Sequence, residues 1–339
     1  MVKKCTIRDV AALAGVSVGT ASMVLNGSEK LNEDTRRRVY DAVEKLDYRR
    51  NPHARSLSSQ KSHTIGLVVT DLTNPFFGMI VGHIQREIDE RGYDLFLGMT
   101  KNANANEKKV VSKFIDNVVD GLIIVPAHDK KQDLSHIYEL ARRGIPYIYL
   151  TTYYAGTPGS CVMTDLAEGS YMLVNYLLEN GHRNISLVSG YRELVLSAER
   201  IKGFMRAYEE HGINVSPEQI VEGDPDFDGG RAAFDKIIAR GKPDAVMTVN
   251  DIVCMGVLTR AKELGLKVPN DLSVAGYDDL LSSRMLETPL TTVRQPIKEI
   301  CARAVDMLFR KIEDPGQEDT IVKLTPQLFI RSSTRQGNP

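Results

Sequence analysis

Apolar positions at helical spacing predict two short helices within residues 6–26, separated by a turn at Gly15. Thr6 can cap the first helix, and Ser17 can cap the second. Because two helices this short cannot bury a core alone, a third must close them, and the apolar stripe within 33–46 supplies it. The pattern is typical of a helix-turn-helix, although small-residue helix pairs also occur as ordinary packing in helical proteins.

From residue 65 onward, short apolar runs alternate with amphipathic helical segments. This alternation occurs twice and predicts two doubly wound parallel sheets. The expected fold is therefore a small all-α head followed by an α/β core of two subdomains, with a cleft between them. The expected strands lie at 65–71, 93–100, 121–127 and 147–150 in the first series, and at 161–164, 185–190, 245–250, 273–278 and 321–330 in the second.

The predicted domain boundaries follow these changes of pattern. The linker after the head is rich in serine and basic residues, and Asn51-Pro52 can begin one or two helical turns that need outside support. The boundaries are 1–50 for the helix-turn-helix, 51–62 for the linker, and 63–339 for the core, with about 63–160 and 291–320 in the first subdomain and about 161–290 and 321–339 in the second.

Composition is ordinary for a globular protein, because 42% of the 339 residues are apolar and 26% are charged. No apolar run approaches the length of a membrane span, and the N-terminus lacks the apolar core of a signal peptide. We therefore expect a cytoplasmic protein with no membrane partner. The four cysteines show neither metal-ligand nor redox spacing, so they are expected to be buried free thiols. Neither a metal nor a cofactor is expected.

Charge is distributed unevenly along the chain. Residues 1–62 hold twelve Lys and Arg against seven Asp and Glu, whereas the remainder holds 31 against 37. A basic head on an acidic body fits nucleic-acid binding by the head, since Lys and Arg neutralise phosphates.

Short motifs spread over almost the whole chain occur in a fixed order. They are TIRDVAALAGVS at 6–17, S-x-VLNG at 22–27, NPHARSL at 51–57, DLTNPFF at 71–77, VDG at 119–121, GHR at 181–183, ND at 250–251, GYDD at 276–279 and IRSS at 330–333. Together they resemble the lac repressor (LacI/GalR) family of bacterial transcription factors. The resemblance implies a helix-turn-helix, a hinge helix, and a two-subdomain core like the type I periplasmic sugar-binding proteins.

The resemblance also implies DNA contacts in the head and the linker. Residues 51–58 would form the hinge helix, with Leu57 of each protomer wedged into a minor-groove step. Met23 stands where many members carry Arg, so apolar contact would replace hydrogen bonds to guanine, and base discrimination should be weaker or differently directed. The implied contacts are Thr6, Val18, Gly19, Thr20, Ser22, Met23, Asn26, Tyr48, His53, Ala54, Arg55 and Leu57.

A small-molecule effector, sugar-like in the family, is expected in the cleft. Carboxylate, guanidinium and amide groups bind hydroxyls in pairs. Phe77 can equally belong to the core, however, Arg200 can be a charge on a helix surface, and Asp278 can be a structural turn. Leu194 and Leu196 occupy a loop where relatives carry polar ligands, so we expect a pocket more apolar than one for a simple hexose. The implied effector contacts are Asp71, Asn74, Phe76, Phe77, Thr151, Asp165, Arg200, Asn250 and Asp278.

Two other functions share parts of this pattern. An enzyme on an α/β fold is disfavoured because no Gly-x-Gly-x-x-Gly follows a strand and no P-loop or catalytic triad is recognisable. A sugar-binding transport protein would share the core but would not need residues 1–60. We therefore predict a non-enzymatic repressor that binds double-stranded operator DNA under effector control. A homodimer is expected rather than a tetramer, because no heptad repeat follows the last strand.

Overall fold

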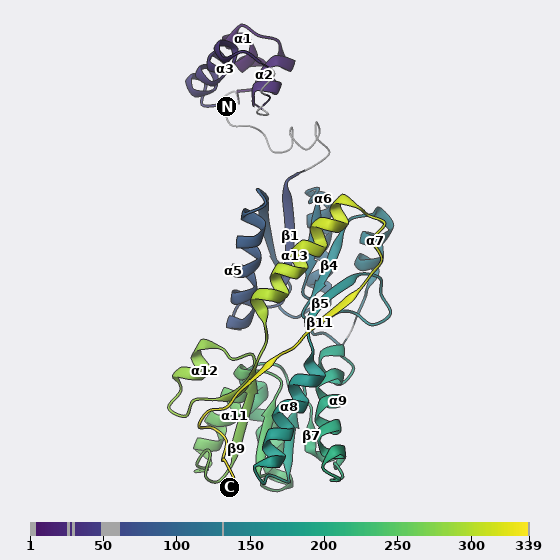
Figure 1. Cartoon of the computed structure of the whole chain (residues 1–339), viewed down its shortest axis with the longest axis vertical. Coiled ribbons are helices and arrows are strands. Elements are labelled where there is room, and N and C mark those ends of the chain that lie inside the picture. Colours follow the sequence, from purple (N-terminus) through teal and green to yellow (C-terminus); the bar gives the residue numbers. More distant parts are fainter. Residues whose placement is uncertain (1–4, 26–27, 29–30, 49–61, 131, 338–339) are drawn as a thin grey trace. The chain divides into compact units, whose positions relative to one another are not determined.

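The computed structural model describes residues 5–25, 28, 31–48, 62–130 and 132–337 (Figure 1). The chain divides into two compact units, Met1–Ser62 and His63–Pro339. The first unit is the head and the second is the core, which confirms the predicted fold class. Among the described residues no single helix is long and apolar enough to cross a membrane, and only the bent pair of Ile7–Ala14 and Val18–Leu25 passes that test when taken together.

The head consists of three helices around a small apolar core. Side chains from all three helices are buried there, including Val10, Val24 and Val39. The helices are α1 (Ile7–Ala14), α2 (Val18–Leu25) and α3 (Glu33–Lys45).

Local capping explains where the first two helices begin and where the first one ends. The Thr6 backbone N–H donates to Asp9 Oδ2 at 2.8 Å, and Ser17 Oγ accepts from the Thr20 backbone N–H at 3.0 Å. Gly15 ends α1 in the left-handed region, with φ of 64°. These contacts confirm the caps expected from the sequence.

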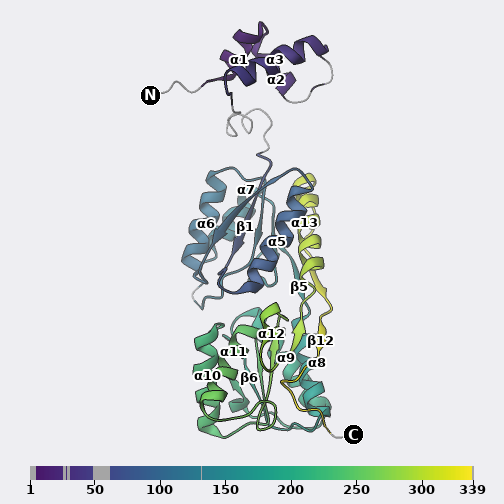
Figure 2. The ribbon, with the colours of Figure 1, turned by 90° about the vertical axis from the view of Figure 1, so that its left-hand side faces the viewer.

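The first subdomain of the core is a parallel sheet covered on both faces. Val68 and Ile124 pack beneath α6 and α7, whereas Leu67 and Ile123 pack beneath α5 and α13 on the opposite face (Figure 2). The strand order is β11-β5-β4-β3-β1-β2. The bounds are β1 (Thr64–Val69), α5 (Pro75–Asp89), β2 (Asp94–Met99), α6 (Asn104–Asp116), β3 (Gly121–Ile124), α7 (Ser135–Arg143), β4 (Tyr147–Leu150), β5 (Ser160–Thr164), α13 (Ile297–Glu313) and β11 (Ile321–Leu324).

The second subdomain repeats this architecture with one antiparallel edge strand. Helices α8 and α9 cover one face of its sheet, and α10 and α11 cover the other. The strand order is β12-β10-β9-β8-β6-β7, and β12 runs antiparallel to β10. The bounds are α8 (Leu166–Glu179), β6 (Ile185–Val188), α9 (Val195–Glu210), β7 (Ile220–Val221), α10 (Phe227–Arg240), β8 (Ala245–Thr248), α11 (Asp251–Glu263), β9 (Ser273–Tyr277), α12 (Leu281–Met285), β10 (Thr291–Arg294) and β12 (Gln327–Phe329).

Three predicted subdomain boundaries are wrong. Strand β5, expected at the start of the second subdomain, pairs with β4 in the first sheet, and β11 pairs with β5. Strand β10, expected in the first subdomain, pairs with β9 in the second sheet. An apolar run indicates that a strand is buried. Which of the two sheets the strand joins depends on its pairing with distant strands, and the run itself gives no information about that pairing.

The chain therefore crosses between the subdomains after β5, after β10 and after β11. Hydrogen bonds join the three crossing segments to one another. Thr164 Oγ1 donates to Gln295 Oε1 at 2.6 Å, and the Asp165 backbone N–H donates to the Leu324 carbonyl at 2.8 Å. The two sheets are consequently tied together where their strands end.

Candidate functional site

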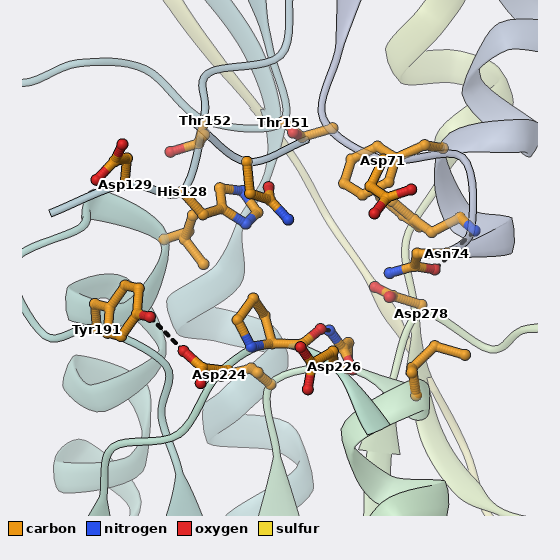
Figure 3. Close-up of a pocket in the computed structure, with 18 of the residues that line it drawn as sticks. Asp71, Asn74, His128, Asp129, Thr151, Thr152, Tyr191, Asp224, Asp226 and Asp278 are labelled. Carbon is orange, nitrogen blue, oxygen red and sulfur yellow. Dashed lines mark hydrogen bonds between the residues drawn. The ribbon is translucent and has the colours of Figure 1, made fainter. Parts of the chain in front are cut away.

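A cavity of about 660 Å³ lies between the two subdomains of the core. Small-molecule sites typically occupy roughly 300–1,000 Å³. Asp71 and Thr151 lie on the side of the first subdomain, and Asp224 and Asp226 lie opposite them on the second (Figure 3). The predicted effector residues that line the cavity are Asp71, Asn74, Phe76, Phe77, Thr151, Arg200, Asn250 and Asp278.

Asp165 is the one predicted effector residue that does not line the cavity. Its carboxylate accepts a hydrogen bond from the Glu168 backbone N–H at 3.0 Å and thereby caps α8. Leu196 lines the cavity, whereas Leu194 is buried at the start of α9 and does not. The family resemblance implied that Asp165 contacts the effector, whereas in the structure its carboxylate serves the start of α8.

Helix starts position the two amides of the site. Asn74 Oδ1 accepts from the Phe76 backbone N–H at 3.0 Å at the start of α5. Asn250 Oδ1 accepts from the Val253 backbone N–H at 2.8 Å at the start of α11, and its Nδ2 donates to the Pro225 carbonyl at 3.1 Å. Capping therefore fixes both side chains where they line the cavity. The hydrogen-bonding capacity of each amide that is not used in capping is available to a ligand in a defined geometry.

Arg200 and Asp278 lie in a largely enclosed part of the cavity, since each is only 5% exposed. The Arg200 guanidinium stacks on Tyr277, with Cζ 4.3 Å from the ring centroid, and its Nε has no hydrogen-bond partner in the described part of the chain. Asp278 Oδ1 accepts from Gln295 Nε2 at 2.6 Å. Burial raises the pKa of Asp278 well above its usual range and lowers the pKa of Arg200. A ligand with hydroxyl groups would satisfy this unused hydrogen-bonding capacity.

The end of the cavity opposite Asp278 contains polar residues that the sequence analysis missed. The Tyr191 hydroxyl donates to the Asp224 carboxylate (Figure 3). Lys130 Nζ lies 4.4 Å from the centroid of the Tyr191 ring. Burial, with the nearby charge of Arg200, lowers the pKa of His128 to about 4, so this side chain is neutral at physiological pH.

Strand ends were the signal for these missed residues. His128 follows β3, Tyr191 follows β6 and Asp224 follows β7, and ligands of open α/β sheets bind beyond the carboxyl ends of the strands. Five of the described lining residues are aspartates, and Leu196 is among the apolar residues that line the cavity with them.

Helix α2 of the head presents an exposed apolar face. Val18 is 44% exposed and Met23 is 45% exposed, whereas Ala21 and Val24 on the other face are buried in the head. Gly19 and Thr6 are exposed, and Thr20, Ser22 and Tyr48 are partly exposed. The predicted DNA contacts Asn26, His53, Ala54, Arg55 and Leu57 lie outside the described residues.

Comparisons with known proteins cover both units. Residues 6–51 match the family described as bacterial regulatory proteins, lacI family, and residues 174–334 match the periplasmic binding protein-like domain. The HTH-type transcriptional repressor PurR of Aliivibrio fischeri is 33% identical over 331 residues, which cover 97% of this chain and 98% of the relative.

Two solved structures are similar over the whole chain. The lac repressor dimer bound to operator and the anti-inducer ONPF has a TM-score of 0.86 and 27% identity, covering 98% of this chain and 99% of that one. The complex of the transcriptional regulator CelR with cellobiose has a TM-score of 0.74 and 29% identity, covering 97% and 99%.

Proposed function

Since the chain belongs to the lacI family of bacterial regulatory proteins and is a DNA-binding transcriptional repressor, not an enzyme, we propose that a carbohydrate-like effector bound in the core controls its affinity for operator DNA. The observation that carries this proposal is the convergence of eight predicted contact residues on one 660 Å³ cavity.

The chemistry of the cavity supports a polyhydroxylated ligand. Arg200 can donate hydrogen bonds, and Asp278 can accept them or, when protonated, donate one. The capped amides of Asn74 and Asn250 offer both donors and acceptors. The ring of Phe77 supplies an apolar face beside them, which suits the C–H side of a sugar ring. The polar groups at Tyr191 extend the cavity beyond the reach of one ring, so we favour a ligand larger than a monosaccharide.

For the head, we infer that α2 enters the major groove of the operator. Its exposed residues Val18 and Met23 would then contact base edges, chiefly the methyl group of thymine. Phosphates or nearby base edges would be contacted by Thr6, Gly19, Thr20, Ser22 and Tyr48. Phosphate contacts fix the register of the protein on the DNA without reading the base sequence directly.

We also infer that two chains associate and act in the cytoplasm, where they meet operator DNA. The similar lac repressor structure is a dimer on its operator. In this chain, Leu281 and Met285 of α12 are 68% and 76% exposed, and Phe96 and Met99 on the edge strand β2 are 45% and 47% exposed. Apolar side chains exposed to this extent suit burial against a second copy.

Replacing Met23 by Arg should create a new base preference. A guanidinium can form two hydrogen bonds with guanine, which favours that base by about tenfold or more at one operator position. Selection of duplexes from a randomised library by the wild type and the Met23→Arg variant measures this preference. Leu13→Arg adds the same charge at an exposed position of α1 and should raise affinity without a new preference. An unchanged preference in Met23→Arg would argue against placing α2 in the groove.

Replacing both Leu281 and Met285 by Lys should convert the dimer to a monomer, because two charges cannot be buried at an apolar interface without partners. Sedimentation equilibrium should give the mass of two chains for the wild type and of one chain for the variant. Met205→Lys, which alters an exposed apolar residue of α9, should leave the dimer intact. A dimeric double variant would mean that α12 lies outside the interface.

Replacing Arg200 by Ala should weaken effector binding about 10- to 100-fold, as expected for losing hydrogen bonds from a buried charged group. Thermal shift against a panel of monosaccharides, cellobiose, lactose and purine bases identifies the effector, since a ligand raises the stability of the state that it binds. Arg206→Ala, on the same helix but exposed, should bind as the wild type does. A purine base as the strongest ligand, or an unaffected Arg200→Ala variant, would contradict the proposal.

A further inference from the structure

Glu107 is a fully buried carboxylate in the first turns of α6. Three donors surround it. The Ala127 backbone N–H donates to Oε2 at 2.7 Å, the Tyr154 hydroxyl lies 2.9 Å from the same oxygen, and His136 Nε2 lies 2.7 Å from Oε1. Glu107 does not line the cavity, and none of the predicted contacts includes it.

The same turn of α6 also holds the segment that follows Ala127. The Asn104 backbone N–H donates to Asp129 Oδ2 at 3.0 Å, and Asn104 Oδ1 accepts from the Asp133 backbone N–H at 2.7 Å. Lys108, one turn later, pairs with Asp133 at 2.7 Å. The start of α6 therefore fixes this segment at Ala127, at Asp129 and at Asp133.

This segment supplies a wall of the cavity and reaches the other subdomain. His128, Asp129 and Lys130 all line the cavity, and Figure 3 shows His128 and Asp129 on the side facing Tyr191. Lys130 Nζ lies 4.4 Å from the centroid of the Tyr191 ring and 3.5 Å from Glu222 Oε2, and both of these residues belong to the second subdomain. A displacement of the segment would alter both the wall and the contact across the cleft.

We propose that Glu107 is a positioning residue for the effector cavity. Although it does not line the cavity, it holds the backbone of Ala127 and thereby fixes the position of the wall at 128–130. A carboxylate that accepts several hydrogen bonds in a dry interior holds its donors firmly, because leaving any of them without an acceptor is costly. The inference rests on the proposed function of the cavity. Glu107 acts through the backbone of Ala127 and does not touch the ligand.

Glu107→Gln tests this role with little change of volume. The amide places an NH₂ group among donors, so at least one donor loses its acceptor. Amide hydrogen exchange at 127–130 should become at least about tenfold faster, with exchange elsewhere in the core unchanged. Affinity for the sugar selected from the panel, with cellobiose as the first probe, should fall about tenfold, whereas operator affinity without sugar should stay the same.

Two further variants separate positioning from general stability. Glu139→Gln makes the same chemical change on α7, where Glu139 pairs with the exposed Arg143, and should affect neither measurement. Tyr154→Phe removes one donor to Glu107 and also a hydroxyl that accepts from the Ala127 backbone N–H at 3.1 Å, so exchange at 127–130 should become faster in this variant too.

Unchanged exchange at 127–130 in Glu107→Gln would overturn the proposal. Faster exchange throughout the core, with sugar affinity falling in proportion to stability, would also overturn it, because Glu107 would then serve the fold in general. If the wild type binds no sugar of the panel, the proposed carbohydrate effector fails, while the local exchange result still decides whether Glu107 holds the wall.

Discussion

The hydrogen-bonded crossings between the subdomains are the constraint on which the site depends. Gln295 lies in one crossing and bonds to Thr164 in another, while its amide also holds Asp278 in the cavity. Parallel strands gather their carboxyl ends at one edge of a sheet, and the crossings bring the two edges together. The side chains that follow the strands therefore converge on one cavity, although they come from distant parts of the sequence.

Buried polar groups determine what this cavity can bind. Arg200 and Asp278 are almost fully enclosed, and their hydrogen-bonding capacity is only partly used within the protein. Leaving such groups unsatisfied is costly, so a ligand that completes their hydrogen bonds gains affinity, and an apolar ligand does not. Glu107 shows the complementary case, since its three neighbouring donors serve to hold a wall in place.

The sequence predicted features that depend on neighbouring residues. The cap at Ser17 and the β–α alternation are local, so both the head and the doubly wound core could be predicted. Sheet membership of β5, β10 and β11 could not, because it depends on pairing between segments far apart in the chain. Asp165 was named only because the family resemblance implies an effector contact there, yet the structure uses it to cap α8. Tyr191 was missed although the strand predicted at 185–190 ends directly before it, because none of the motifs that carry the family resemblance includes this loop.

The most direct test of the account is the coupling between cavity and operator. Anisotropy of a labelled operator duplex, selected from a random library, should be measured with increasing protein at zero and saturating concentrations of the sugar found by thermal shift. Effector coupling typically changes affinity by about 5- to 150-fold, so the operator Kd should change by about tenfold or more, and Arg200→Ala should abolish the change. The same operator Kd with and without saturating sugar would contradict the central claim.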